Sequence, residues 1–359
     1  MNGNALKSRK KCLAVADWPD PDRRTWARIT EPAASILDDP GPGAHWRPAT
    51  RDKRQGDYGR WLGFLTSENL LDAAIKPEDR LAPEFARRYV MALRGRVTSF
   101  TVWSYLDGLY SVMSAMAPGR DWSWLRKMVN RLQRDARPSR KVEHRVLPAG
   151  RLFETGIRRM REAERRPPRL ALDRSSWYRD GLQIAFLIAR PVRRRNLANI
   201  RIGHNLIRLE AGYQLHFPPE ETKTSRPLDF PLPAELILWM HRYLGYHRPQ
   251  LLQGNESDLL WVSNLGQGMT INSVGARICE VTEELFGVRI SPQLFRKSAA
   301  TTIAIERPEE IAIVRAILGH SNGRTAERHY IQASTIEASR RFGDSLDRRR
   351  RRLLKQFEV

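Results

Sequence analysis

The hydrophobic pattern of this chain is helical along most of its length and changes to a strand-like alternation in one region. On both sides of that region, apolar residues recur at the three- and four-residue spacing of helices that bury one face. From Ile207 onward, apolar and polar side chains alternate around Gly212, which is typical of short strands joined by a turn. This pattern predicts a mainly α-helical protein with a small antiparallel β-sheet.

The length of 359 residues exceeds what one hydrophobic core usually serves, so we expect two domains with short appendages. Helical patterns up to residue 136 carry Lys and Arg on their polar faces and predict an all-helical unit. A second unit begins with helices near residue 150, includes the sheet and returns to helices after Pro233. The predicted segments are an N-terminal arm or extension (1–44), a helical domain (45–136), a basic linker (137–149), an α+β domain (150–340) and a basic tail (341–359).

Residues 1–44 mix charge, proline and glycine, with turn clusters at 18–21 and 39–43, so little regular structure is expected there. The first helix of the helical domain is expected after Pro48, where Tyr58, Trp61 and Leu65 follow at helical spacing. Further helices are predicted at 83–93, 99–116, 122–132, 151–164 and 176–188.

Positive charge is in excess along the whole chain. Its 62 Lys and Arg residues stand against 40 Asp and Glu residues, which gives a formal net charge of +22. Such a surface is expected to bind a polyanion. No apolar run approaches the ~18 residues of a membrane-spanning helix, and the basic start lacks the pattern of a secretory signal. We expect a cytoplasmic, nucleoid-associated protein of bacterial type that does not enter a membrane.

Four clusters in the second unit carry residues capable of chemistry: 190–197, rich in arginine; 221–226, with Lys223 between two strand-like segments; 291–296, which opens a helix; and 317–330, with His320 and Tyr330. Taken singly, each has an ordinary structural interpretation as a solvated basic surface, a turn lysine, a helix terminus or a packing tyrosine. Their joint order makes a functional interpretation preferable.

In this order the clusters resemble the active site of the tyrosine recombinase, or phage integrase, family. That family assembles one site from an Arg, a Lys on a strand turn, a His-x-x-Arg box, a Leu-Gly-His box and a nucleophilic Tyr. The most specific part is Leu318-Gly319-His320, which is followed ten residues later by Tyr330. The resemblance extends upstream, since residues 46–135 are similar to the helical, SAM-like core-binding domain of the family. The matching positions are Arg193, Lys223, Gln293, Arg296, His320 and Tyr330.

The resemblance implies a role for each matched residue. Arg193 and Arg296 would grip nonbridging oxygens of the scissile phosphate in a fork geometry that guanidinium groups provide. Tyr330 would attack phosphorus and form a 3′-phosphotyrosyl link with release of a 5′-hydroxyl. Lys223 would protonate the departing oxygen, and His320 would hydrogen-bond to the phosphate or position the tyrosine. No cofactor and no metal is expected, and Cys12 and Cys279 are too few and too far apart to form a thiolate site.

Three residues near this chemistry depart from the family pattern. Gln293 stands where the box usually has His, Pro191 where Gly is common, and Asn196 where an acid is usual. Glutamine donates and accepts hydrogen bonds but takes no proton at neutral pH, so general-base duty there would pass to water or be lost. Within the arginine run, Arg194 is the second choice for the catalytic arginine and Arg195 the third.

The function implied by the resemblance is site-specific DNA recombination for integration or excision of a mobile element. It also implies a homotetramer on DNA, or an assembly mixed with a sister recombinase, and a possible directionality factor. The Arg348–Arg352 run could contact DNA, dock onto a neighbouring protomer or simply stay solvated.

Other interpretations stay open from the sequence. A DNA-binding accessory or regulatory relative with weak or lost catalysis is favoured by Gln293 and Asn196. A type IB topoisomerase shares the Arg, Lys, His and Tyr chemistry, but the Leu-Gly-His box and the two-domain layout favour an integrase. A helical RNA-binding or structural protein would explain the charge and leave the ordered clusters unexplained.

Overall fold

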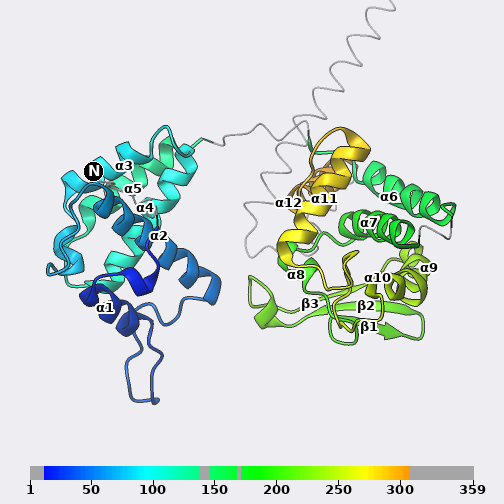
Figure 1. Cartoon of the computed structure of the whole chain (residues 1–359), viewed down its shortest axis with the longest axis horizontal. Coiled ribbons are helices and arrows are strands. Elements are labelled where there is room, and N and C mark those ends of the chain that lie inside the picture. Colours follow the sequence, from blue (N-terminus) through cyan, green and yellow to red (C-terminus); the bar gives the residue numbers. More distant parts are fainter. Residues whose placement is uncertain (1–11, 138–144, 168–170, 307–359) are drawn as a thin grey trace, which may run out of the picture. The chain divides into compact units, whose positions relative to one another are not determined.

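The computed structural model describes residues 12–137, 145–167 and 171–306 (Figure 1). The chain divides into two compact units, unit 1 (residues 1–141) and unit 2 (residues 142–359). The division falls inside the stretch 137–149, where we expected a basic linker. The assignment of separate roles to the five predicted segments remains a prediction.

Unit 1 is built from helices alone among its described residues. Tyr58, Trp61 and Leu62 from the first long helix are fully buried together with Leu106 and Leu109 from the fourth. The start expected after residue 47 is confirmed, with proline in the first turn where its missing N–H costs nothing. The α-helices are α1 (Asp20–Thr30), α2 (Pro48–Ser67), α3 (Pro83–Leu93), α4 (Ser99–Met116) and α5 (Ser123–Asp135), with 3₁₀ turns at Val15–Asp17 and Pro77–Arg80.

The expectation of little regular structure before residue 45 is wrong for the described residues 12–44. Helix α1 lies there, and Trp18, Trp26 and Ile29 join the core of unit 1. The helix is also fixed by a buried charge, because Asp22 accepts hydrogen bonds from Tyr58 Oη at 2.6 Å and from Arg80 Nη1 at 2.6 and 2.7 Å. The proline and glycine clusters mark the turns on either side of α1 and not an unstructured arm.

Unit 2 combines helices with one three-stranded sheet, which lies to one side of its long helices in Figure 1. The described elements are α6 (Ala149–Glu164), α7 (Ala171–Ala189), α8 (Arg194–Ala198), β1 (Leu206–Leu209), β2 (Gly212–Phe217), β3 (Leu228–Pro231), α9 (Ala234–Arg242), a π-helical turn (Tyr243–His247), α10 (Arg248–Leu252), α11 (Ile271–Phe286) and α12 (Pro292–Glu306). The mainly α fold with a small antiparallel sheet is therefore confirmed.

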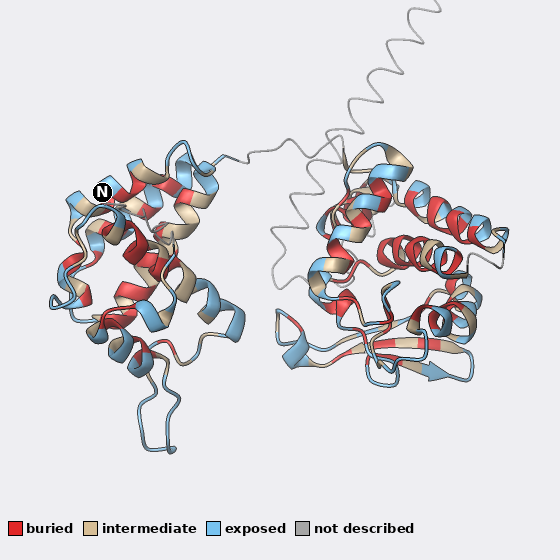
Figure 2. Ribbon diagram, in the orientation of Figure 1, coloured by how far each residue is buried: buried red, intermediate tan, exposed pale blue. Residues whose placement is uncertain are grey.

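Helix α7 is the centre of unit 2. Every residue from Tyr178 to Ile188 is buried, so the inner half of this helix has no solvent-facing side (Figure 2). It meets α6 at two glycines: a Cβ at Gly156 would lie 2.7 Å from the Gly181 carbonyl oxygen, and a Cβ at Gly181 would lie 2.7 Å from that of Gly156. The two backbones therefore approach more closely than any larger residue allows.

The sheet has the order β1-β2-β3, and both neighbouring pairs are antiparallel. Alternate residues of β2, namely Tyr213, Leu215 and Phe217, are buried, as expected from the alternating pattern. Leu215 pairs with Leu206 on β1 and with Phe230 on β3. This register fixes the start and end points of the connection between β2 and β3, which carries Lys223.

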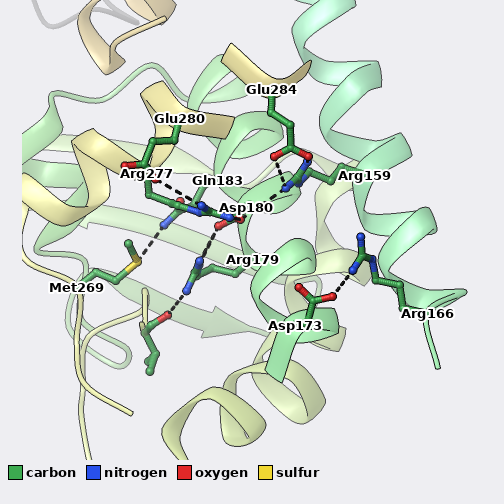
Figure 3. A network of polar contacts seen from close by, with 11 residues as sticks. Arg159, Arg166, Asp173, Arg179, Asp180, Gln183, Met269, Arg277, Glu280 and Glu284 are labelled. Carbon is green, nitrogen blue, oxygen red and sulfur yellow. Dashed lines mark hydrogen bonds and ion pairs between the residues drawn. The ribbon is translucent and has the colours of Figure 1, made fainter. Parts of the chain in front are cut away.

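A buried carboxylate holds α7 to its neighbours. Asp180 is 0% exposed and accepts hydrogen bonds from Arg179 at 2.7 Å and from Arg277 of α11 at 2.7 Å. Arg159 of α6 approaches the same carboxylate at 3.9 Å and forms a two-bond contact with Glu284 of α11, at 2.9 and 3.1 Å (Figure 3). Three guanidinium groups thus surround Asp180 and tie α6, α7 and α11 together.

We expect Asp180→Asn to lower the free energy of unfolding by about 3–5 kcal/mol, because it leaves the surrounding guanidinium groups without their buried counter-charge. The matched control is Asp173→Asn on the same helix, whose exposed pair with Arg166 should be worth less than about 1 kcal/mol. Urea denaturation of the full chain, followed by circular dichroism, measures both. Equal midpoints for the two variants would contradict the structural role of Asp180.

Candidate active site

Two arginines from distant parts of the chain meet at the ends of α8 and α12. Arg296 is 5% exposed, and its guanidinium donates a hydrogen bond to the carbonyl of Pro191, 105 residues away in sequence. Burial, and next the nearby positive charge of Arg193, lower the pKa of Arg296 to about 10. Arg296 therefore stays charged at neutral pH.

Arg193 is half-buried at the N-terminal boundary of α8, and burial lowers the pKa of its guanidinium. The charge of Arg193 lowers the pKa of Arg296, so the two guanidinium groups lie close enough to interact electrostatically. Their positive charges repel each other, so an anion between them would be stabilised by both. This arrangement suits a phosphate.

The structure separates the four arginines of the run 190–195 by environment. Arg190 donates to the Pro231 carbonyl at 2.7 and 2.9 Å and so fastens the end of α7 to the end of β3. Arg194 is exposed and its side chain lies over Gly275 of α11, where an added Cβ would sit 2.9 Å from the arginine Cδ. Arg195 is exposed as well. This geometry favours Arg193 over both alternatives.

Lys223 is exposed on the connection between β2 and β3, as the strand pattern predicts. The turn that carries it is closed by Thr222, a buried residue whose hydroxyl donates to the Arg226 carbonyl at 2.8 Å and accepts from the Arg226 N–H at 3.1 Å. Ser225, in the same turn, has a left-handed φ of 51°. Lys223 therefore sits on a closed turn rather than on a loose loop.

Helix α8 and the Lys223 connection are joined by a hydrogen bond. The buried Asn196 amide donates to the Glu221 carbonyl oxygen at 3.1 Å. Asn196 follows Arg193 by three residues and Glu221 precedes Lys223 by two, so this bond links the segments of two predicted catalytic residues. An amide suits this contact, since a carboxylate has no proton to donate to a carbonyl.

A second anchor comes from Asn205, which sequence reasoning missed. Its side chain is 1% exposed and donates to the Glu221 carboxylate at 2.8 Å and to the His216 carbonyl at 3.1 Å, and it accepts from the Arg201 N–H at 3.0 Å. The only signal in the sequence is Gly203-His204-Asn205, an ordinary turn composition. His216 and Glu221 lie on other segments, so no local pattern could reveal the contacts with them.

Of the other three predicted site residues, Gln293 is described and His320 and Tyr330 are not. Gln293 is exposed in the first turn of α12, three residues before the buried Arg296. His320 and Tyr330 lie outside the described residues, as do the Leu318-Gly319-His320 box and the Arg348–Arg352 run. The structure thus brings together the segments of Arg193, Lys223 and Arg296 and leaves the roles of all six residues as predictions.

Among the described residues, no group of three or more His, Cys, Asp or Glu side chains is placed to hold a metal ion. Within the same ranges, none of the helices combines the length and the apolar character needed to cross a bilayer.

Comparisons with known proteins find similarity to one family. The model of the phage integrase family matches residues 162–336. The tyrosine recombinase XerD of Proteus mirabilis is 33% identical over 99 residues, covering 27% of this chain and 31% of the relative. XerD of Pseudomonas aeruginosa is 34% identical over 106 residues, covering 29% and 35%. The chain thus matches about a third of the length of these curated relatives.

Solved structures share the fold at low sequence identity. XerH site-specific recombinase bound to its difH substrate in a pre-cleavage complex has a TM-score of 0.53 at 13% identity, over 89% of this chain and 94% of that chain. A lambda integrase dimer bound to a COC′ core site has a TM-score of 0.50 at 12% identity, over 80% and 90%.

Unit 2 has the fold of the catalytic domain in these recombinase structures, and most of it falls within the region that matches the family model. The matched region, residues 162–336, is a domain of the phage integrase, or tyrosine recombinase, family, whose members catalyse the cleavage and transfer of DNA strands.

We expect Asn205→Asp to loosen the Lys223 connection, because the new carboxylate would face the Glu221 carboxylate and the His216 carbonyl in place of two N–H donors. The new carboxylate would itself be buried without a donor for these two acceptors, which should cost about 1–3 kcal/mol locally. Amide hydrogen exchange of residues 218–226 is the measurement, and it should accelerate. The exposed neighbour substitution Asn199→Asp serves as control, and unchanged exchange in Asn205→Asp would count against this anchor.

Proposed function

We propose that this chain is a site-specific recombinase that cleaves and rejoins double-stranded DNA through a 3′-phosphotyrosyl intermediate, for integration and excision of a mobile element. The observation that supports this most is the buried Arg296 beside Arg193, held there by the Pro191 carbonyl. A hydrogen bond to a carbonyl leaves the guanidinium fully charged. Two such cations would compensate a phosphodiester that gains negative charge in the transition state.

The proposed first step is an in-line attack of the Tyr330 hydroxyl oxygen on phosphorus. The bond from phosphorus to the 5′-oxygen breaks, and Lys223 transfers a proton to that oxygen, which leaves as a hydroxyl group. A second 5′-hydroxyl then attacks the phosphotyrosyl bond and releases the tyrosine. The energy of the phosphodiester is kept in the covalent link, so the reaction needs no high-energy cofactor.

The remaining two residues would support this reaction. His320 would donate a hydrogen bond to the phosphate or position Tyr330. Gln293 can donate a hydrogen bond from the first turn of α12 but accepts no proton at neutral pH, so the tyrosine proton would pass to water.

We extend the proposal to the assembly. The net charge of +22 supports binding to double-stranded DNA, and most Lys and Arg contacts would be to phosphates. The active form would be a homotetramer on DNA, or an assembly with a sister recombinase, in which a directionality factor selects integration or excision. The protein would work in the cytoplasm at the nucleoid.

One observation favours a second function. Gln293 removes a proton acceptor from the predicted site, which suits a DNA-binding accessory or regulatory relative with weak or lost catalysis. Such a protein would bind the same DNA without forming a covalent link.

The test of the proposed function is a suicide-substrate assay with nicked duplex DNA from the boundary of the protein's own genetic element. We expect the wild type to form a covalent adduct that survives a denaturing gel. Tyr330→Phe should form none, since the nucleophilic oxygen is gone, and Tyr246→Phe should behave as the wild type. DNA binding by the wild type and Tyr330→Phe with no adduct from either would favour the accessory function.

The paired arginines generate a further prediction. Arg296→Lys keeps the charge but loses the planar fork, so adduct formation should slow by roughly 10²- to 10³-fold while DNA affinity changes little. Single-turnover adduct kinetics and fluorescence anisotropy measure the two quantities. Arg195→Lys, at an exposed position of α8, should leave both unchanged; an equal loss in both variants would argue against a special role for Arg296.

A further inference from the structure

The connection that carries Lys223 is held at Glu221 from two sides. The main-chain oxygen of Glu221 accepts from Asn196 of α8, and its carboxylate accepts from Asn205 at 2.8 Å and contacts His204 Nε2 at 3.0 Å. Since Asn205 is buried and also bonded to His216 at the end region of β2, Glu221 is fastened to both the helix of Arg193 and the sheet. Glu221 is thus the residue on which these contacts converge.

The next residues transmit this anchoring to Lys223. Thr222 is 1% exposed and closes the turn through Arg226, and the Ser225 N–H bonds back to the Thr222 carbonyl at 3.4 Å. The main chain at Lys223 therefore has little freedom relative to Glu221. What remains flexible is the four-carbon side chain of the lysine, which projects from the surface.

We infer that Glu221 is a positioning residue for Lys223: it holds the base of the lysine in reach of the oxygen that leaves the phosphate between Arg193 and Arg296. This inference rests on the proposed function. A general acid must come within hydrogen-bond distance of its acceptor, and a fixed attachment point removes much of the entropy lost in reaching it. Glu221 itself touches neither DNA nor the reacting atoms in this role.

The identity of Asn196 follows from the same contact. Its acceptor is a main-chain carbonyl, so the side chain at this position must supply a hydrogen-bond donor, which the Asn196 amide does and an ionised carboxylate does not. Asn196 and Asn205 therefore hold opposite ends of the same residue, one at the main chain and the other at the carboxylate.

Proton transfer from Lys223 to the leaving 5′-oxygen can be distinguished experimentally from the other effects of Glu221. When the bond from phosphorus to the 5′-oxygen breaks, the alkoxide must receive the proton of the Lys223 ammonium group, which is left as a neutral amine. If sulfur replaces that bridging oxygen, the departing thiolate is stable at neutral pH and needs no proton. A defect confined to proton donation should therefore disappear with the sulfur substrate.

The experiment compares single-turnover adduct formation by the full chain on two nicked duplexes, one with the natural 5′-oxygen and one with a 5′-bridging sulfur at the cleavage position. We expect Glu221→Ala to react roughly 10- to 100-fold more slowly than the wild type on the oxygen substrate. On the sulfur substrate the two proteins should differ by less than about threefold. Glu221→Gln should retain most of the wild-type rate, because its amide oxygen still accepts from Asn205.

The matched control is Glu220→Ala, which removes the same charge from the exposed neighbouring residue and should leave both rates unchanged. Equal slowing of Glu221→Ala on both substrates would assign Glu221 a structural or DNA-binding role and overturn the inference, as would a wild-type rate on the oxygen substrate. If the wild type forms no adduct with either substrate, the proposed function fails, and the positioning role fails with it. The first two outcomes reject the positioning role alone, because the wild type would still cleave.

Discussion

The complete burial of the second half of α7, Tyr178 to Ile188, is the constraint on which unit 2 depends. A helix with no solvent-facing side must be covered from all directions, and this one also carries Arg179 and Asp180 in its buried half. Asp180 is compensated by Arg179 of the same helix and by Arg277 and Arg159, which α11 and α6 bring to it. These ion pairs hold α6 and α11 against α7. The position of α7 in turn sets where its C-terminal end lies, and Arg193 follows that end by four residues.

Three hydrogen bonds to main-chain carbonyl oxygens connect the segments of the candidate site. Pro191 accepts from Arg296, Glu221 accepts from Asn196, and Pro231 accepts from Arg190. A carbonyl satisfies an N–H donor without cancelling the charge of the group that donates. The site can therefore be rigid and strongly cationic together, whereas carboxylate partners would hold the arginines equally well and neutralise them.

Sequence reasoning succeeded where the information is local. The strands around Gly212, the helix boundary at Thr98, whose hydroxyl accepts from the Thr101 N–H, and the turn at Lys223 all follow from short patterns of residues. It failed at residues 12–44, because proline and glycine were given more weight than the helical spacing of Asp22, Trp26 and Ile29. That segment is stabilised by long-range contacts with the rest of unit 1.

By itself the sequence determined the mainly helical fold with one small sheet, the positive charge of the surface and the order of the catalytic motifs, because composition and periodicity are properties of the chain alone. Only the tertiary structure decided that Arg193 is half-buried and close enough to lower the pKa of Arg296, whereas Arg194 and Arg195 are exposed. It also decided that Glu221 accepts hydrogen bonds from Asn196 and Asn205. These contacts join segments far apart in sequence, and which donor reaches which acceptor depends on how α7, α8 and the sheet pack.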